Sequence, residues 1–161
     1  MIVVSDTSPI SNLVLIGRLD ILQNLFLQLV IPPKVLMEVQ ALQDFGVDTS
    51  TFEQADWIKV QSPQNAIEVS QLLSEINRGE AEAIVLAEET KAGLLLIDER
   101  LGWRVAQRKN IPTVGLLGCL IKSKKVGYIK RVKPVIDDLQ SRAGFWVGEE
   151  LIAKVLNTAD E

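Results

Sequence analysis

Four separate segments of the chain each carry an acidic residue beside the start, or on the edge, of an expected helix. Asp6 and Asp98 lie at the ends of short, mainly apolar runs that are typical of buried strands, and Glu38 borders the apolar stripe of a helix. Glu80 and Glu82 lie near the start of another helix but about 200° apart around it, so only one can face a shared site. Clustered carboxylates repel one another unless a cation lies between them. The acids therefore predict a site for Mg²⁺ or Mn²⁺, where a water molecule can be activated for phosphodiester hydrolysis.

The chain contains no histidine and one cysteine, and this excludes several kinds of site. Ser-His-Asp triads, Cys-His pairs and zinc sites made of histidines or thiolates cannot be built. A catalytic metal must then be bound by oxygen ligands, which again indicates Mg²⁺ or Mn²⁺. Cys119 cannot form an internal disulfide, so we expect a small buried residue in a protein of the reducing cytoplasm.

The two aspartates also have a structural interpretation, because an Asp between a strand and a helix often caps the helix. For Asp6 we expect Ser8 to be the cap instead, followed by Pro9 at the first helical position. This would leave the carboxylate of Asp6 unused. For Asp98 capping stays an open alternative.

The glutamates have structural alternatives as well. A carboxylate on the edge of a buried stripe is unfavourable unless it is paired or bound to metal, and Lys34, one turn before Glu38, is a possible partner. Glu80 lies three residues after Asn77, which is the spacing of a capping box. Each acid taken alone is thus ambiguous, and the prediction depends on their convergence.

The elements that must position these acids alternate along the chain. We expect strands over 3–4, 27–31, 57–61, 93–98 and 111–115. We expect helices over 9–16, 18–26, 32–43, 66–75, 77–92 and 99–110, a loop over 43–56, and mostly helix after 115 with breaks near 127 and 144–148. The alternation predicts a three-layer α/β/α sandwich around a mainly parallel sheet. Ligands of such sheets bind outside the carboxyl ends of the strands, where Asp6 and Asp98 are expected.

Length and composition are typical of one globular domain. The 161 residues are 47% hydrophobic and 24% charged, and no linker or repeat divides them, so we expect a single domain over 1–161 with a helical extension from about 128. No apolar run reaches the roughly 18 residues that a membrane helix needs. We also find no signal-peptide pattern at the start and expect a cytoplasmic protein.

Charge is distributed unevenly along the chain. The formal net charge is −4, yet residues 100–133 contain 10 Lys and Arg and no acid. This basic block begins directly after the last candidate acid, and a basic surface beside a metal site is suited to bind a phosphate backbone. The residues expected to contact RNA are Arg100, Arg104, Arg108, Lys109, Lys122, Lys124 and Lys125. The alternatives are a solvated face and a docking surface for an acidic partner.

Four motifs, in order, resemble those of PIN-domain ribonucleases, in particular the small prokaryotic PIN-like proteins related to the toxins of toxin–antitoxin pairs. "VSDTSPISNL" is similar to their first strand motif, and "PPKVLMEV" resembles the segment with the second acid. "GEAEAIVLA" resembles the third motif, in which an acid is followed seven residues later by Ala; Glu80 and Ala87 fit this spacing and Glu82 does not. "LLLIDE" resembles the fourth, and the four motifs span roughly residues 1–120.

The resemblance implies an endoribonuclease that uses Mg²⁺ or Mn²⁺. Asp6, Glu38, Glu80 and Asp98 would be both catalytic and metal-binding. Secondary candidates are Ser8, which would orient Asp6 or a water molecule, Glu82 as the alternative third acid, and Glu99 as an additional ligand. The chain departs from the commoner toxin pattern by having Glu as the third acid and "ERLGW" after the fourth.

The resemblance also implies partners: an RNA substrate, a cognate antitoxin if the protein is a toxin, and a second copy in a homodimer. Apolar residues near the C-terminus could close the core or form the dimer seam; they are Phe145, Trp146, Val147, Leu151, Ile152, Val155 and Leu156. The alternative function is a PIN-like module that has lost efficient catalysis and binds RNA or protein.

Overall fold

A single parallel sheet forms the centre of the molecule. The computed structural model describes residues 1–161, with strands β1 (Val3–Ser5), β2 (Leu29–Ile31), β3 (Ile58–Val60), β4 (Leu94–Leu96) and β5 (Thr113–Val114). Their order is β3-β2-β1-β4-β5, and every neighbouring pair is parallel. The chain builds β2 and β3 on one side of β1 and then crosses to β4 and β5, so the strand order reverses between β1 and β4. Ligands of open α/β sheets bind at such a reversal.

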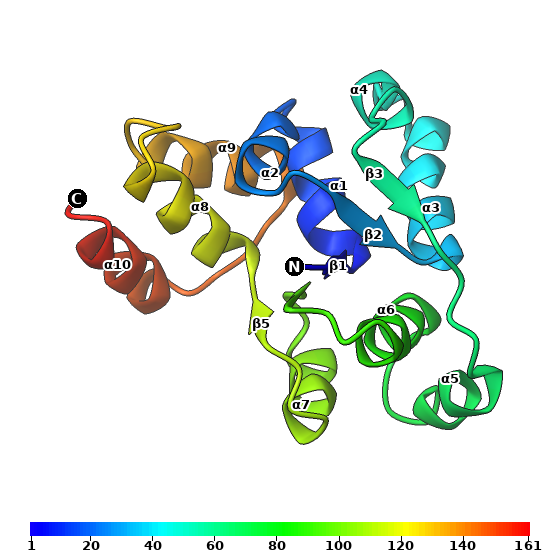
Figure 1. Cartoon of the computed structure of the whole chain (residues 1–161). Coiled ribbons are helices and arrows are strands. Elements are labelled where there is room, and N and C mark those ends of the chain that lie inside the picture. The colour runs from blue at the N-terminus through cyan, green and yellow to red at the C-terminus, as the bar shows by residue number, and fades with distance from the viewer.

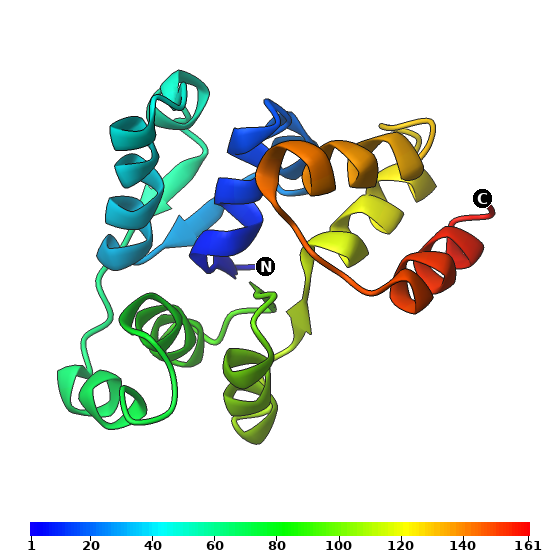
Figure 2. The same ribbon diagram turned by 180° about the vertical axis from the view of Figure 1, so that it is seen from behind.

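Helices cover both faces of this sheet (Figures 1 and 2). They are α1 (Thr7–Leu15), α2 (Asp20–Leu25), α3 (Pro33–Gln40), the 3-10 helix η1 (Ala41–Phe45), α4 (Ser50–Glu53), α5 (Ala66–Leu72), α6 (Arg78–Glu89), α7 (Arg100–Arg108), α8 (Leu116–Lys125), α9 (Lys133–Ala143) and α10 (Glu149–Thr158). Successive strand residues point to opposite faces. Accordingly Val3 joins one core cluster, with α1, α2, α3, α8 and α9, and Val4 joins a second, with α5, α6 and α7. The predicted three-layer α/β/α sandwich is confirmed.

The expected start of the first helix is wrong by two residues. The helix begins at Thr7 with Asp6, not Ser8, at the N-cap position, although the side chain of Asp6 makes no capping hydrogen bond. Pro9 is tolerated as the third helical residue because the first amides of a helix have no partner within it.

Two other expectations need correction. The second strand is Leu29–Ile31 rather than 27–31, and Leu27 is exposed. The stretch 43–56, expected to be a loop, contains the end of η1 and the short helix α4. There Asp48 Oδ1 accepts a hydrogen bond from the Ser50 amide at 2.9 Å, and the buried Phe52 anchors the helix to the core.

The C-terminal apolar residues divide into two groups. Val155 is buried in the larger core cluster, and Phe145, Ile152 and Leu156 pack against it, whereas Trp146 stays exposed. α10 packs on α8. No helix combines the length and the apolar character that crossing a membrane requires.

Candidate metal centre

Asp6 and Asp98 lie at the carboxyl ends of the two central strands. Ser5 of β1 is in register with Leu96 of β4, and the amide of Asp6 donates to the carbonyl of Leu96 at 2.9 Å. The two aspartates therefore leave adjacent strands at the same edge of the sheet, where the strand order reverses. The structure confirms this expected placement.

One oxygen of the Asp98 carboxylate accepts a hydrogen bond, and the other has no partner. Its Oδ1 accepts a hydrogen bond from the amide of Leu116, at the start of α8, at 2.8 Å. A Cβ atom on Gly115 would approach that oxygen to 2.7 Å, so a glycine is needed there for the carboxylate to fit. Oδ2 is buried and makes no hydrogen bond. An unsatisfied buried carboxylate oxygen is unfavourable, and a cation would relieve it.

Glu38 reaches the site from α3. Its Oε1 accepts a hydrogen bond from Thr7 Oγ1 at 3.1 Å, so its partner is Thr7 and not Lys34. The same oxygen lies directly against Gly79 of α6, where any Cβ atom would collide with it. Glu38 is half-buried, as its position on the edge of the apolar stripe predicts.

Glu80 is buried at the start of α6 and oriented by the cap of its own helix. Asn77 accepts a hydrogen bond from the Glu80 amide at 2.9 Å, and its Nδ2 donates to Glu80 Oε1 at 3.1 Å. Asn77 therefore caps the helix, but the expected capping box is only half formed, because the Glu80 carboxylate accepts from the side chain of Asn77 and not from its backbone amide. The side-chain bond holds the carboxylate in place. Across from it, Gly102 of α7 leaves room for Glu80 Oε2.

Electrostatic coupling shows that the acids lie near one another. Burial raises the pKa of Asp6 to about 7, with smaller contributions from three neighbouring carboxylates. These belong to Glu80, Glu38 and Asp98. Burial likewise raises the pKa of Glu80, with Glu99 and Glu38 adding to the effect, and burial and Glu99 raise the pKa of Asp98. Glu99 thus belongs to the same negative field, although it is exposed.

The remaining secondary candidates have other partners. Glu82 Oε1 accepts a hydrogen bond from the Lys34 amide at the start of α3 at 3.1 Å, and Oε2 lies 3.7 Å from Arg78. Its carboxylate therefore joins α6 to α3 rather than to the other acids. Ser8 Oγ accepts from Asn12 at 3.4 Å and lines an open cleft together with Asp98 and Glu99.

The donor set fits a hard divalent cation. All candidate ligands are carboxylate oxygens, and Asp98 Oδ2 lacks a partner. Burial, and to a smaller extent repulsion from the other acids, raises the pKa of Asp6, and a bound cation would offset both effects. No group of three acids is arranged so that it could hold one ion as it stands. A bound ion would therefore complete its coordination with water molecules, as Mg²⁺ commonly does, or with side chains that turn toward it.

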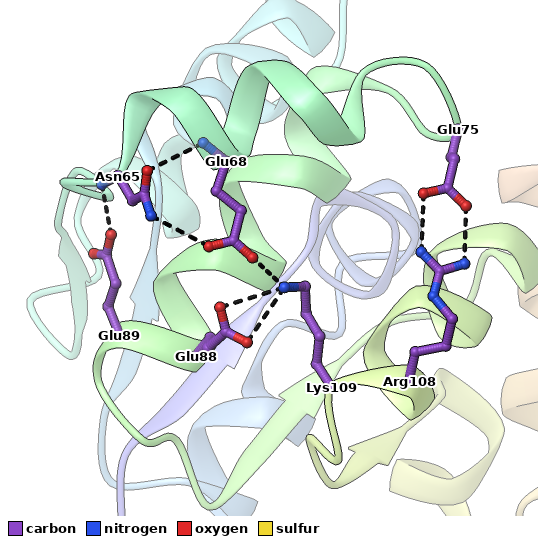
Figure 3. Close-up of polar contacts among 7 residues, drawn as sticks. All are labelled: Asn65, Glu68, Glu75, Glu88, Glu89, Arg108 and Lys109. Atoms are coloured by element: carbon purple, nitrogen blue, oxygen red, sulfur yellow. Dashed lines mark hydrogen bonds and ion pairs between the residues drawn. The ribbon is translucent and has the colours of Figure 1, made fainter.

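The basic residues fall into paired and unpaired groups. Arg108 makes a two-pronged ion pair with Glu75, at 2.8 and 2.9 Å, and Lys109 bridges Glu68 of α5 and Glu88 of α6 (Figure 3). Lys124 pairs with Glu161 at 3.0 Å. The other four expected RNA contacts form no ion pair and are exposed: Arg100, Arg104, Lys122 and Lys125.

The residues that hold the acids in place were mostly missing from the sequence interpretation. Thr7 stands in the first motif between Asp6 and Ser8, but only contact with α3 identifies it as the partner of Glu38. Gly79 and Gly115 leave space for carboxylates of distant segments, and no local pattern marks them.

Comparison with known proteins identifies the family. No curated protein matches the chain. The sequence profile of a family described as a PIN domain matches residues 2–161, nearly the whole chain. PIN domains are in general nucleases, and the sheet with its acidic edge is a nuclease-like fold. The chain belongs to the PIN-domain family.

Proposed function

We propose that this protein is a metal-dependent endoribonuclease that hydrolyses phosphodiester bonds in single-stranded or loop RNA. The observation that carries the proposal is the convergence of acids from four segments on one sheet edge, with a buried Asp98 oxygen left without a partner. Mg²⁺ or Mn²⁺ is the proposed cofactor, because oxygen donors suit these ions. Family membership supports nucleic acid as the substrate.

Asp6, Glu38, Glu80 and Asp98 are the proposed catalytic and metal-binding residues. A bound divalent cation would supply positive charge that activates a water molecule and offsets the charge of the scissile phosphate. Asp6 and Asp98 would hold the ion from the strand ends. Thr7 would keep Glu38 oriented, and Asn77 would do the same for Glu80.

We assign the third acid to Glu80 rather than Glu82, because Glu82 is engaged with the start of α3. Ser8 and Glu99 line the cleft beside Asp98 and remain secondary candidates for holding a water molecule or the ion. The RNA backbone would contact Arg100 and Arg104 of α7 and Lys122 and Lys125 of α8. Arg108, Lys109 and Lys124 would contribute only if they leave their present partners.

From the resemblance to toxins we further propose a homodimer and, where the genome supplies one, a cognate antitoxin. A second candidate function is a binding module without efficient catalysis. It is favoured by the absence of any three acids arranged to hold one ion as they stand.

RNA cleavage by the purified protein tests the proposal, in Mn²⁺ and in EDTA, beside Asp6→Asn, Glu80→Gln and Glu82→Gln. We expect metal-dependent cleavage that falls at least about 100-fold in the first two variants. Glu82→Gln is the matched control on the same helix and should stay within about threefold of the wild type where it is folded. Calorimetric titration with Mn²⁺ should show the same ranking for binding.

Equal cleavage by the wild type and Asp6→Asn would indicate a contaminating nuclease and contradict the assignment. Mn²⁺ binding without cleavage of several unrelated RNAs would favour the binding module. A larger loss in Glu82→Gln than in Glu80→Gln would reverse the choice of the third acid.

A further inference from the structure

A cleft of about 720 Å³ opens beside Asp98. One part of its lining is polar and comes from α1 and from the residues that follow β4: Ser8, Asn12, Asp98 and Glu99. The rest is mainly apolar and comes from α8, from α10 and from the connection between α9 and α10, which passes the start of α8 (Figures 1 and 2). The cleft is within the size range of small-ligand sites, and it includes Asp98 of the candidate metal centre.

The most exposed aromatic side chain of this lining is Trp146, which is 82% exposed. Exposure alone does not distinguish Trp146, but its ring lies beside a cleft that also includes Asp98, and a free aromatic face can stack on a flat ligand ring. Its neighbours Phe145 and Val155 are packed into the protein, so the wall around Trp146 is anchored although its ring is free.

The backbone that carries Trp146 is held in place at both ends. Gly144 ends α9 in the left-handed conformation, with φ of 65°, and the Phe145 amide donates to the carbonyl of Leu139 at 3.0 Å. This bond fixes the direction in which the chain leaves α9. On the other side α10 begins at Glu149 and packs on α8. The ring therefore projects from an anchored segment.

We propose that this cleft is a nucleotide subsite in which Trp146 stacks on a base of the RNA next to the scissile phosphate. The inference rests on the proposed nuclease function and adds a substrate-binding residue to it. A nucleotide joins a phosphate to a flat ring, and the cleft joins the acidic edge to an aromatic wall. Stacking on aromatic side chains is a common way to bind single-stranded RNA and is tolerant of sequence.

Binding of a labelled single-stranded RNA octamer of mixed sequence tests the inference, in Ca²⁺, with the RNA checked for integrity afterwards. We expect Trp146→Ala to weaken binding about tenfold, the change expected when one base loses its aromatic platform. Trp146→Phe should recover most of the affinity. Phe45→Ala is the matched control, because Phe45 is 83% exposed but lies on η1, on the β3 side of the sheet.

An octamer with abasic positions separates stacking from backbone contacts. If Trp146 stacks on a base, Trp146→Ala and the wild type should bind the abasic RNA equally. A direct signal comes from the variant Trp57→Phe with Trp103→Phe, in which Trp146 is the sole tryptophan and its fluorescence should be quenched by the normal octamer.

Three results would overturn the subsite: unchanged affinity in Trp146→Ala, an equal loss for normal and abasic RNA, or no binding by the wild type. If Trp146→Ala changes the oligomeric state and leaves the RNA affinity unchanged, the apolar side of the cleft would instead be an interface with a second copy of the chain.

The nuclease proposal can fail separately. Binding that depends on Trp146 without any hydrolysis in Mn²⁺ would leave the subsite standing, whereas hydrolysis indifferent to Trp146 would leave only the nuclease.

Discussion

Each of three candidate acids is held by a specific donor, and the fourth is held mainly by its surroundings. Thr7 holds Glu38, Asn77 holds Glu80, and the amide of Leu116 holds Asp98. Asp6 instead lies buried among other acids, and burial with their charge raises its pKa to about 7. The folded protein without metal thus binds a proton at Asp6 more tightly than the unfolded chain does.

This difference predicts how stability depends on pH. The pKa of Asp6 is 3.8 in the unfolded chain and about 7 in the folded protein. The contribution of Asp6 to stability is therefore fully present below about pH 4 and is lost as the pH rises to about 7. In EDTA, Asp6→Asn should therefore be more stable than the wild type above pH 7, and the difference should shrink as pH falls. The difference in the free energy of unfolding between the two proteins should change by at most about 1.4 kcal/mol per pH unit.

Urea denaturation at several pH values measures this effect, with the exposed Asp44→Asn as the control that should follow the wild type. Mn²⁺ should reverse the order, because a ligand that binds only the folded state stabilises it. An Asp6→Asn variant that is less stable than the wild type at pH 8 in EDTA would refute the electrostatic interpretation.

At the scale of the elements, the start of α6 organises the site. Asn77 caps the helix, Glu80 turns toward the other acids, and Gly79 leaves space for Glu38 of α3. Glu82, on another side of the same helix, binds the start of α3. The start of α6 thus orients Glu80 and leaves space for the carboxylate of Glu38.

Gly79→Ala tests this arrangement without changing any charge. Alanine is the better helix former, by up to about 1 kcal/mol, so the melting temperature should stay the same or rise. Its Cβ atom would displace the carboxylate of Glu38. Losing an oriented ligand should weaken Mn²⁺ binding and cleavage about tenfold.

Gly148→Ala is the control, because no atom lies within 4 Å of the site where its Cβ would be. Wild-type Mn²⁺ affinity in Gly79→Ala would show that Glu38 does not need its present position.

Across the molecule, some residues of the basic block form ion pairs within the protein, and others are exposed and unpaired. Lys109 joins the end of α7 to α5 and α6, and Arg108 joins it to the connection between these two helices. Arg100 and Arg104 instead carry free charge on α7, close to Asp98 in the sequence. An overall charge of −4 therefore coexists with a locally basic surface of the kind that binds phosphate groups.

Measuring RNA binding at different salt concentrations distinguishes basic residues that contact RNA from those that form ion pairs within the protein. Each contact with single-stranded RNA contributes about 0.7 to the slope of log affinity against log salt, so replacing both Arg100 and Arg104 by Ala should lower it by about 1.4. Arg108→Ala should leave the slope nearly unchanged and affect only stability. A greater reduction of the slope in Arg108→Ala would mean that its pair with Glu75 opens on RNA binding.

Much of the architecture could be predicted from local patterns. Apolar runs and helix starts marked all five strands and the main helices, because periodicity and capping act between near neighbours. The two aspartates could be placed together at one sheet edge, because parallel strands end at the same side. The predicted starts of α1 and β2 are wrong by two residues each, because the ends of helices and strands are weakly defined in sequence.

The details of the site depend on contacts between distant segments, and only the folded chain decides them. The angle around α6 separates Glu80 from Glu82, but the hydrogen bond from Lys34, 48 residues earlier, shows which of them faces away from the acids. Ion pairs with residues of α5, α6 and the connection between them neutralise the charges of Arg108 and Lys109. The cleft beside Trp146 is formed where α10 packs on α8. Such choices depend on burial and distance, which no local pattern contains.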